Sequence, residues 1–371
     1  MSILIDPERI TFAREMKGLS KKELAMKVDK TPSAISQIEK GVIRPDTETL
    51  TRISFALSVP PNFFAKKERS KYINFGHCHF RLKRAVSQIK RKQSVRIGDF
   101  FIELIDLLQS KGVVFPEEKI SGFHFQPKAM NDIEIAAMEL RKFWGMGLGP
   151  IPNITRLLES KGIIVTPILG SCEEVDAFSV CDGSRPWIML AYGGTASRAR
   201  FDAAHELGHL ILHEEHTPGS SITENEADRF AGAFLAPRDG FILECPRRWD
   251  YDAFAKLKFR WKLSIQALVY RAYNLGVLSQ HSVRRAFIDI NQRGQRKNEG
   301  EEWAKEYPTL FNQALELICD KTSLYELASE LCISKADLIS YLDGTVSADL
   351  IRKLDKKNDE SNGQLVFLRE C

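Results

Sequence analysis

Residues 205–209 read His205-Glu206-Leu207-Gly208-His209, and this stretch decides what the central part of the chain can be. On a helix, two imidazoles four residues apart lie on one face, where both can bind the same metal ion. Glu206 directly follows the first histidine and would project toward a water held by that ion. The apolar residues on both sides fit a helix with one buried face. The stretch predicts a metal-binding helix with a general base beside the metal, the pattern of a zinc hydrolase.

A catalytic zinc ion takes three protein ligands and keeps one position open for water, so a third ligand must come from elsewhere. His213 is the nearest candidate. A continuous helix would separate it from His205 by about 12 Å, whereas Zn–N bonds measure about 2.0–2.1 Å. No glycine lies between His209 and His213 to bend the chain. We therefore expect the third ligand on the next helix rather than at His213.

The next helix is predicted for residues 222–236 and offers three acids, Glu224, Glu226 and Asp228. Glu224 and Asp228 lie one turn apart on the same face. Glu224 can then bind the metal while Asp228 holds a ligand histidine in the right tautomer. Glu226 fits a capping box that begins at Thr223, although Ser221 and Glu224 fit such a box equally well. Capping alone does not decide between them, and we expect Glu224 as the ligand and Asp228 as its support.

Several segments together resemble the ImmA/IrrE family of zinc metallopeptidases: residues 198–213, 224–231 and 234–237, within a likeness that runs over roughly residues 132–290. In that family the third ligand is a Glu four residues before an Asn or Asp, which corresponds here to Glu224 and Asp228. The resemblance implies a zincin-like domain with one Zn²⁺ held by His205, His209 and Glu224, and proteolysis with Glu206 as general base. Asn is the commoner choice at position 228, and Asp228 adds a negative charge near the metal.

Two more features bear on peptide hydrolysis. Tyr270 and Arg271 are candidate donors to the oxyanion, although an Arg on a helix face that pairs with an acidic neighbour is the simpler explanation. Residues 185–192 predict a strand. At a sheet edge this strand could align a substrate by main-chain hydrogen bonds, and inside a sheet it would be an ordinary core strand.

The amino-terminal residues carry a helix-turn-helix pattern. Residues 20–28 and 31–41 predict two helices joined at Asp29, a residue type that tolerates the left-handed backbone of a tight turn. Thr31 is expected to cap the second helix, with Pro32 in its first turn. The pattern resembles the Xre-type repressor DNA-binding domain over its whole length. The expected core residues are Leu24, Ala25, Val28, Ile35, Ile38, Leu50, Ile53 and Leu57.

In such domains the second helix enters the major groove of double-stranded DNA. Residues 1–96 support this partner, since they hold 21 Lys and Arg against 9 Asp and Glu while the rest of the chain is acidic. The alternative is that the helical pair mediates protein contacts. Six residues are candidates for DNA contacts: Ser33, Ser36 and Gln37 for base edges, and Lys21, Lys40 and Arg44 for phosphates.

Length and composition predict several domains with real cores, because the chain has 371 residues and 43% apolar content. The expected fold class is mainly α with an α+β peptidase core. Residues 81–92 and 95–111 predict two bridging helices. Residues 323–342 repeat a helix-turn-helix-like rhythm, but their acidic residues argue against DNA contact and leave partner docking, dimerisation or packing against the peptidase open. The expected parts are a helix-turn-helix domain at 1–64, a charged linker and bridge at 65–131, the peptidase domain at 132–294 and a small helical domain at 295–371.

The seven cysteines show no paired spacing, which argues against a disulfide framework. A redox-sensing role for Cys172 or Cys181 is less expected than that of a small buried apolar residue. No signal peptide is evident and no apolar run is long enough to cross a bilayer, so the expected location is the cytoplasm, without a membrane partner.

Two functions remain open. The chain could be a DNA-binding transcriptional regulator whose zinc endopeptidase domain, active or latent, cleaves a protein regulator such as a repressor or the product of a neighbouring gene. It could instead be a DNA-binding antitoxin or regulator whose zinc domain serves structure or partner binding. A homodimer is compatible with either. Glu206 favours the first function, because a structural zinc site has no need of a general base beside an open position.

Overall fold

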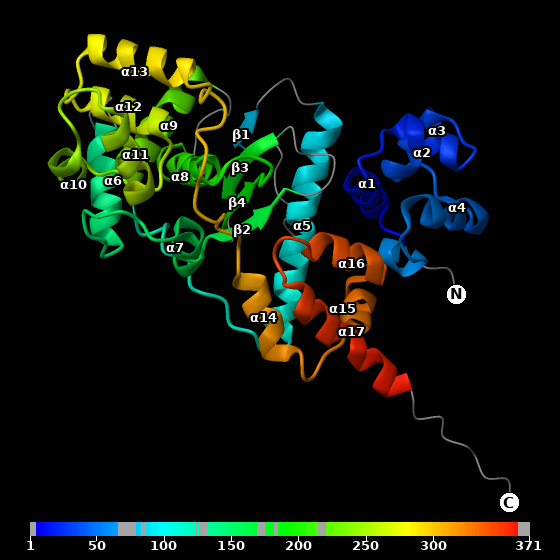
Figure 1. Ribbon diagram of the computed structural model, residues 1–371. Helices are drawn as coiled ribbons and strands as arrows, with labels where there is room; N and C mark the ends of the chain where they lie inside the picture. The colour runs from blue at the N-terminus through cyan, green and yellow to red at the C-terminus, as the bar shows by residue number, and fades with distance from the viewer. Residues whose placement is uncertain are drawn as a thin grey trace, which may run out of the picture.

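The computed structural model describes residues 5–65, 79–82, 87–123, 125, 132–168, 175–181, 185–213 and 220–362. These residues form a mainly helical molecule around a small sheet (Figure 1), which confirms the predicted fold class. The charged linker expected at residues 65–78 lies almost wholly outside the described residues, as does Cys172. No helix in these ranges combines the length and the apolar character that crossing a membrane requires.

The amino-terminal residues form a helix-turn-helix bundle, as the sequence predicts. Asp29 has φ +52° in the turn between the two central helices. Thr31 caps the second of these by accepting a hydrogen bond from the amide of Ala34 at 3.1 Å. All eight expected core residues are buried. The elements are α1 (Pro7–Met16), α2 (Lys21–Lys27), α3 (Pro32–Glu39), α4 (Thr47–Leu57) and the 3-10 turn η1 (Pro61–Ala65).

The described strands form one sheet in the order β1-β3-β4-β2. They are β1 (His79–Leu82), β2 (Ile164–Pro167), β3 (Val175–Cys181) and β4 (Pro186–Leu190). Strand β4 is parallel to β2 and antiparallel to β3, and β1 is antiparallel to β3. The strand predicted for residues 185–192 is therefore β4, which lies inside the sheet. Neighbours on both sides use its main-chain groups, so β4 cannot align a substrate.

Both faces of the sheet are buried, because its side chains alternate between two cores. Ala177, Ile188 and Leu190 pack with the peptidase helices, whereas Phe178 and Trp187 face the opposite core. The helices on the peptidase side are α6 (Asp132–Phe143), α7 (Ile154–Ser160), α8 (Ala196–Leu212), α9 (Ser221–Leu235), α10 (Arg238–Glu244), α11 (Tyr251–Trp261), α12 (Ile265–Asn274) and α13 (Gln280–Gln292).

The bridge between the amino-terminal bundle and the sheet is one long helix, α5 (Gln88–Ser110). The prediction of two helices over residues 81–92 and 95–111 is wrong. Arg81 and Leu82 belong to β1, where their main chain pairs with β3. Ser94 lies inside this helix, and its hydroxyl donates back to the carbonyl of Lys90 at 3.1 Å.

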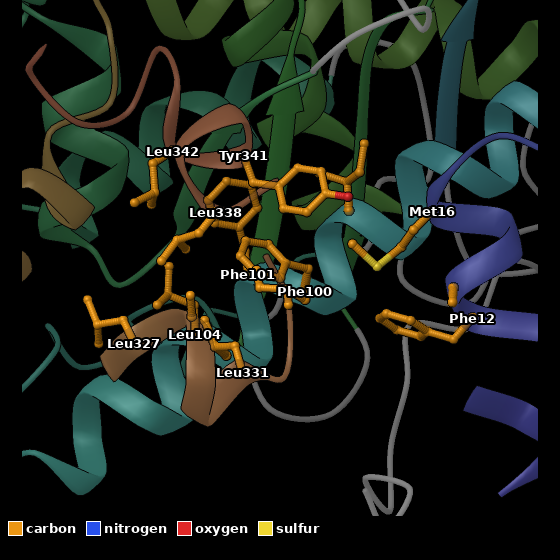
Figure 2. Close-up of a cluster of buried hydrophobic side chains, with 14 of the residues drawn as sticks. Phe12, Met16, Phe100, Phe101, Leu104, Leu327, Leu331, Leu338, Tyr341 and Leu342 are labelled. Atoms are coloured by element: carbon orange, nitrogen blue, oxygen red, sulfur yellow. The ribbon is translucent and has the colours of Figure 1, made fainter. Parts of the chain in front are cut away.

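Helix α5 is the centre of a core that several parts of the chain share. Figure 2 shows Phe100, Phe101 and Leu104 of α5 lying near leucines of the carboxy-terminal helices, with Phe12 and Met16 of α1 in the same cluster. Phe100 packs on Tyr341 with ring centroids 4.8 Å apart. The carboxy-terminal helices are α14 (Leu310–Ile318), α15 (Leu324–Leu331), α16 (Lys335–Leu342) and α17 (Ala348–Asn362). Helices α14, α15 and α16 pack on α5, with α14 and α16 beside it in Figure 1, and α17 packs on α14 and α15.

Two ion pairs connect the acidic side chains of this carboxy-terminal part to the rest of the molecule. Asp337 of α16 binds Lys17, which follows α1, at 2.7 Å. Glu330 of α15 binds Lys111, which follows α5, at 2.6 Å. The acidic residues that argue against DNA contact thus have partners inside the chain.

Helices α8 and α9 lie close together at Gly208. A Cβ at this position would lie 3.1 Å from Phe230 Cδ1 and 3.2 Å from Ala227 Cα. At Gly232 of α9, the nearest atom to such a Cβ would be Arg271 Cδ at 3.8 Å, which is ordinary contact. The two glycines therefore differ in the space around them although both lie inside helices.

We expect Gly208→Ala to lower the free energy of unfolding and Gly232→Ala to leave it unchanged or raise it. Alanine gains about 1 kcal/mol of helix propensity at either position, but overpacking at position 208 costs about 1–3 kcal/mol. Urea denaturation of both variants checks this. Equal stability of the two variants would contradict the close packing of α8 on α9.

Candidate metal centre and nucleic-acid interface

Helices α8 and α9 bring three of the predicted site residues together. His205 and His209 lie one turn apart on α8, buried, with their Nε2 atoms 3.0 Å apart. Glu224 reaches them from the first turn of α9. Its Oε2 lies 3.4 Å from His205 Nε2 and its Oε1 lies 3.4 Å from His209 Nε2. Within the described ranges, these three form the one group of His, Cys, Asp or Glu side chains arranged to hold a metal ion.

The donor atoms fit a zinc ion. Two nitrogens bound at about 2.0–2.1 Å in tetrahedral geometry lie about 3.4 Å from each other, close to the separations of 3.0 and 3.4 Å found here. Other partners engage both Nδ1 atoms. His205 Nδ1 lies 2.8 Å from Asp228 Oδ1, and His209 Nδ1 lies 2.9 Å from His213 Nδ1. Each Nε2 is therefore directed at the space that the three side chains share.

Glu224 is held in its charged form. Burial alone would raise the pKa of this carboxyl group. Hydrogen bonds and charge from His205 and His209 outweigh burial and hold the pKa far below its ordinary value of 4.5. The carboxylate is the form that binds a metal ion.

Glu206 is buried on the same helix and points toward the sheet. Its Oε2 accepts a hydrogen bond of 2.6 Å from the hydroxyl of Ser179, a buried residue of β3. Ser179 was not among the site residues predicted from the sequence. The available signal was a serine between the apolar residues Phe178 and Val180 of this strand.

His213 and Glu226 form a second layer behind His209. His213 is not in the metal-binding group, as the sequence predicts, but its Nε2 lies 2.9 Å from Glu226 Oε2 while its Nδ1 contacts His209. The interpretation of Glu226 as a capping residue is wrong, because α9 begins at Ser221 and its N-cap is Ser220. The four-residue spacing from His209 to His213 was the available signal for this contact.

The two candidate oxyanion donors contact residues other than the three metal-binding candidates. Arg271 is buried, pairs with Glu134 at 2.7 Å and donates to the carbonyl of Ala236 at 2.8 Å. This is the simpler alternative given above, a helix-face Arg with an acidic partner. Tyr270 is half exposed and packs on Phe287 with ring centroids 5.0 Å apart.

The candidate DNA-contacting residues divide into two groups. Ser33 and Gln37 of α3 are exposed, as are Lys40 and Arg44, which follow this helix. Ser36 and Lys21 are half-buried and contact each other, with Lys21 Nζ 3.1 Å from Ser36 Oγ and 3.4 Å from Glu39 Oε2. Lys21 and Ser36 thus already have partners inside the bundle.

Two family models match separate parts of the chain. Residues 159–273 match the IrrE N-terminal-like domain of peptidase family M78, and residues 11–64 match a helix-turn-helix model. These matches confirm the predicted combination, a DNA-binding regulator with a metallopeptidase-type domain. A search of curated proteins found no match.

Among solved structures, one match is PlcR of Bacillus thuringiensis, determined in complex with the peptide PapR7 and DNA. The match covers 98% of this chain and 99% of that chain, at 12% identity and a TM-score of 0.16. A likeness with so low a TM-score carries no argument about fold or function.

Proposed function

We propose that this chain is a DNA-binding regulator whose peptidase-family domain is an active zinc endopeptidase that cleaves a protein regulator. The observation that supports it is the convergence of His205, His209 and Glu224, with Glu206 one residue from the first ligand. Structural zinc sites are closed by four protein ligands, whereas catalytic sites have three. The described donor set has three, which favours catalysis over the alternative of an antitoxin with a structural zinc domain.

In this proposal each residue has a separate task. When bound, a zinc ion would acidify a water molecule and polarise the scissile carbonyl. Glu206 would accept the proton of that water and pass it to the leaving amine. Ser179 would hold the Glu206 carboxylate in place, and Asp228 would fix the His205 tautomer that leaves Nε2 available. Because the partner is DNA, we place the protein in the cytoplasm.

We expect Glu206→Gln to lose cleavage by a factor of about 10²–10⁴, the usual contribution of a general base, and to keep both zinc and fold. The substrates are fluorescein-labelled casein and the product of the neighbouring gene, and zinc content is measured on the same samples. Glu301→Gln, at an exposed position, is the control. Full proteolysis by Glu206→Gln would rule out Glu206 as the base.

Strand β1 bears on whether this activity is latent. An extended substrate commonly adds to a free sheet edge by main-chain hydrogen bonds. Strand β3 carries Ser179, which contacts Glu206, and β1 pairs along the outer edge of β3 with His79 opposite Ser179. We therefore propose that β1 blocks this edge, so that a substrate strand can pair with β3 only after β1 has detached from it.

We expect the double variant Phe80→Pro/Arg81→Pro to detach β1 from β3. Of two successive amides in a strand, one faces the neighbouring strand, and proline has no N–H to donate there. The loss of one such bond, about 0.5–1.5 kcal/mol, should raise casein cleavage by up to about tenfold. The control Phe80→Ala/Arg81→Ala retains both amides. Hydrogen exchange of residues 177–181 reports release directly. Faster exchange without faster cleavage would contradict latency.

The exposed face of α3 carries the proposed base contacts. We expect Gln37→Ala to weaken binding to an operator selected from random DNA by about 1–3 kcal/mol, the discrimination of a good bidentate contact, while peptidase activity stays unchanged. Gln313→Ala, on an exposed position of α14, is the matched control. Binding is measured by fluorescence anisotropy at constant salt. Unchanged affinity would remove Gln37 from the recognition surface.

A further inference from the structure

A cleft of about 1260 Å³ lies beside the metal centre. Its walls come from α6, α8, α9, α10, α12 and residues 296–302, a part of the chain between the peptidase helices and the carboxy-terminal helices. Asp228 lines this cleft and also contacts Nδ1 of His205. The cleft, which we call the basic cleft, therefore extends to Asp228, the residue that orients a histidine of the metal centre.

The acidic residues of the basic cleft all have partners within the protein. Glu134 pairs with Arg271, and Asp228 contacts His205. Glu299 accepts hydrogen bonds from the amides of Ile265 and Gln266 at the start of α12, at 2.7 and 3.1 Å. Glu302 accepts hydrogen bonds from the amide and hydroxyl of Ser197 at the start of α8, at 3.0 and 2.6 Å. These carboxylates are therefore already engaged by donors inside the protein.

Four cationic residues of the cleft differ from these acids. They are exposed, and none has an ion pair within 4.0 Å to any residue in the part of the chain that the structure describes. They come from α9, from the start of α10 and from the segment after α13. They are Arg229, Arg238, Arg296 and Lys297. A concave surface with an excess of one charge attracts and concentrates ligands of the opposite charge.

The wall that carries Arg296 and Lys297 is fixed to the peptidase helices. Besides Glu299 and Glu302, Glu306 further along the segment accepts a hydrogen bond from the amide of Ile154 at 2.7 Å and pairs with the buried Arg200. Three carboxylates thus bind the segment to the starts of α12, α8 and α7. A wall held in this way needs little ordering when a ligand binds, which favours affinity.

The size of the cleft indicates what kind of anion it takes. Sites for small molecules measure about 300–1,000 Å³, and this cleft is larger. Its lining also includes the amide side chains of Asn225, Gln266 and Asn274, which can bind a peptide main chain, and the ring of Tyr270. These features suit several residues of an extended chain better than a compact ion.

We propose that the basic cleft binds an acidic segment of the protein that the metal centre cleaves. The inference rests on the proposed proteolytic function, since it names the substrate class. Binding there would hold the substrate next to α8 and α9 while an adjoining part of its chain enters the metal centre. Substrate selection would then depend on acidic residues away from the scissile bond.

Binding of an acidic peptide to the full chain tests the proposal. The probe is a fluorescein-labelled dodecapeptide in which Glu alternates with Ser, compared with the same peptide carrying Gln for Glu. We expect Arg296→Ala/Lys297→Ala to weaken anisotropy-detected binding of the Glu peptide by about tenfold, or about 1.4 kcal/mol. The Gln peptide should bind weakly to every variant.

The matched control removes the same charge elsewhere. Arg284→Ala/Arg285→Ala, at exposed positions of α13 outside the cleft, should leave binding within about twofold, or about 0.4 kcal/mol. Equal loss in both double variants would show that net charge alone attracts the peptide and would overturn the proposal. Absence of Glu-peptide binding, or binding of pyrophosphate in its place, would overturn it as well.

This binding assay does not require cleavage, so it separates two failures. If the chain binds the Glu peptide in the cleft but cleaves neither casein nor the product of the neighbouring gene, the cleft assignment is supported and the endopeptidase function is contradicted. If proteolysis requires Glu206 while neither peptide binding nor cleavage changes in Arg296→Ala/Lys297→Ala, only the cleft assignment is contradicted.

Discussion

The contact between α8 and α9 is the constraint on which the rest of the candidate site depends. Two imidazoles of α8 can share a metal ion with a carboxylate of α9 only if the helices lie close together. Gly208 permits this approach, because Phe230 and Ala227 occupy the space where a Cβ would stand. The same contact brings Asp228 to His205 and Glu226 to His213. One helix pair therefore sets the donor atoms and the residues that orient them.

The remaining structure holds this helix pair from two sides. The sheet covers α8 and supplies Ser179 to Glu206. Glu302 and Glu306, in the segment after α13, bind the start of α8 and the buried Arg200 of the same helix. On the other face of the sheet, α5 shares one core with the amino-terminal bundle and the carboxy-terminal helices (Figures 1 and 2). The DNA-binding bundle and the peptidase helices are thus joined through packed elements rather than through the linker alone.

The sequence predicted those features whose chemistry is local. The spacing of His205 and His209, the caps and the left-handed turn at Asp29, and the one-turn spacing of Glu224 and Asp228 all lie within single helices or neighbouring ones. The geometry of the described chain agrees with each. The exclusion of His213 as a ligand also followed from helix length alone.

The features that the sequence could not predict depend on contacts between distant residues. Ser179 of β3 contacts Glu206 of α8, which lies 27 positions later, and a serine in a strand does not show which helix residue it will contact. Arg81 and Leu82 were assigned to a helix because pairing with β3 is not visible locally. The contacts of residues 296–302 could not be predicted, because the helix starts that Glu299 and Glu302 bind lie 34 or more positions earlier in the chain.

X-ray absorption at the zinc edge, on the purified full chain and on Glu224→Ala, measures the ligands of the bound metal. We expect one zinc per chain, bound by two imidazoles and oxygen donors, with greatly reduced occupancy in the Glu224→Ala variant. Zinc bound through sulfur, or zinc of unchanged occupancy and ligand shell after removal of Glu224, would contradict it.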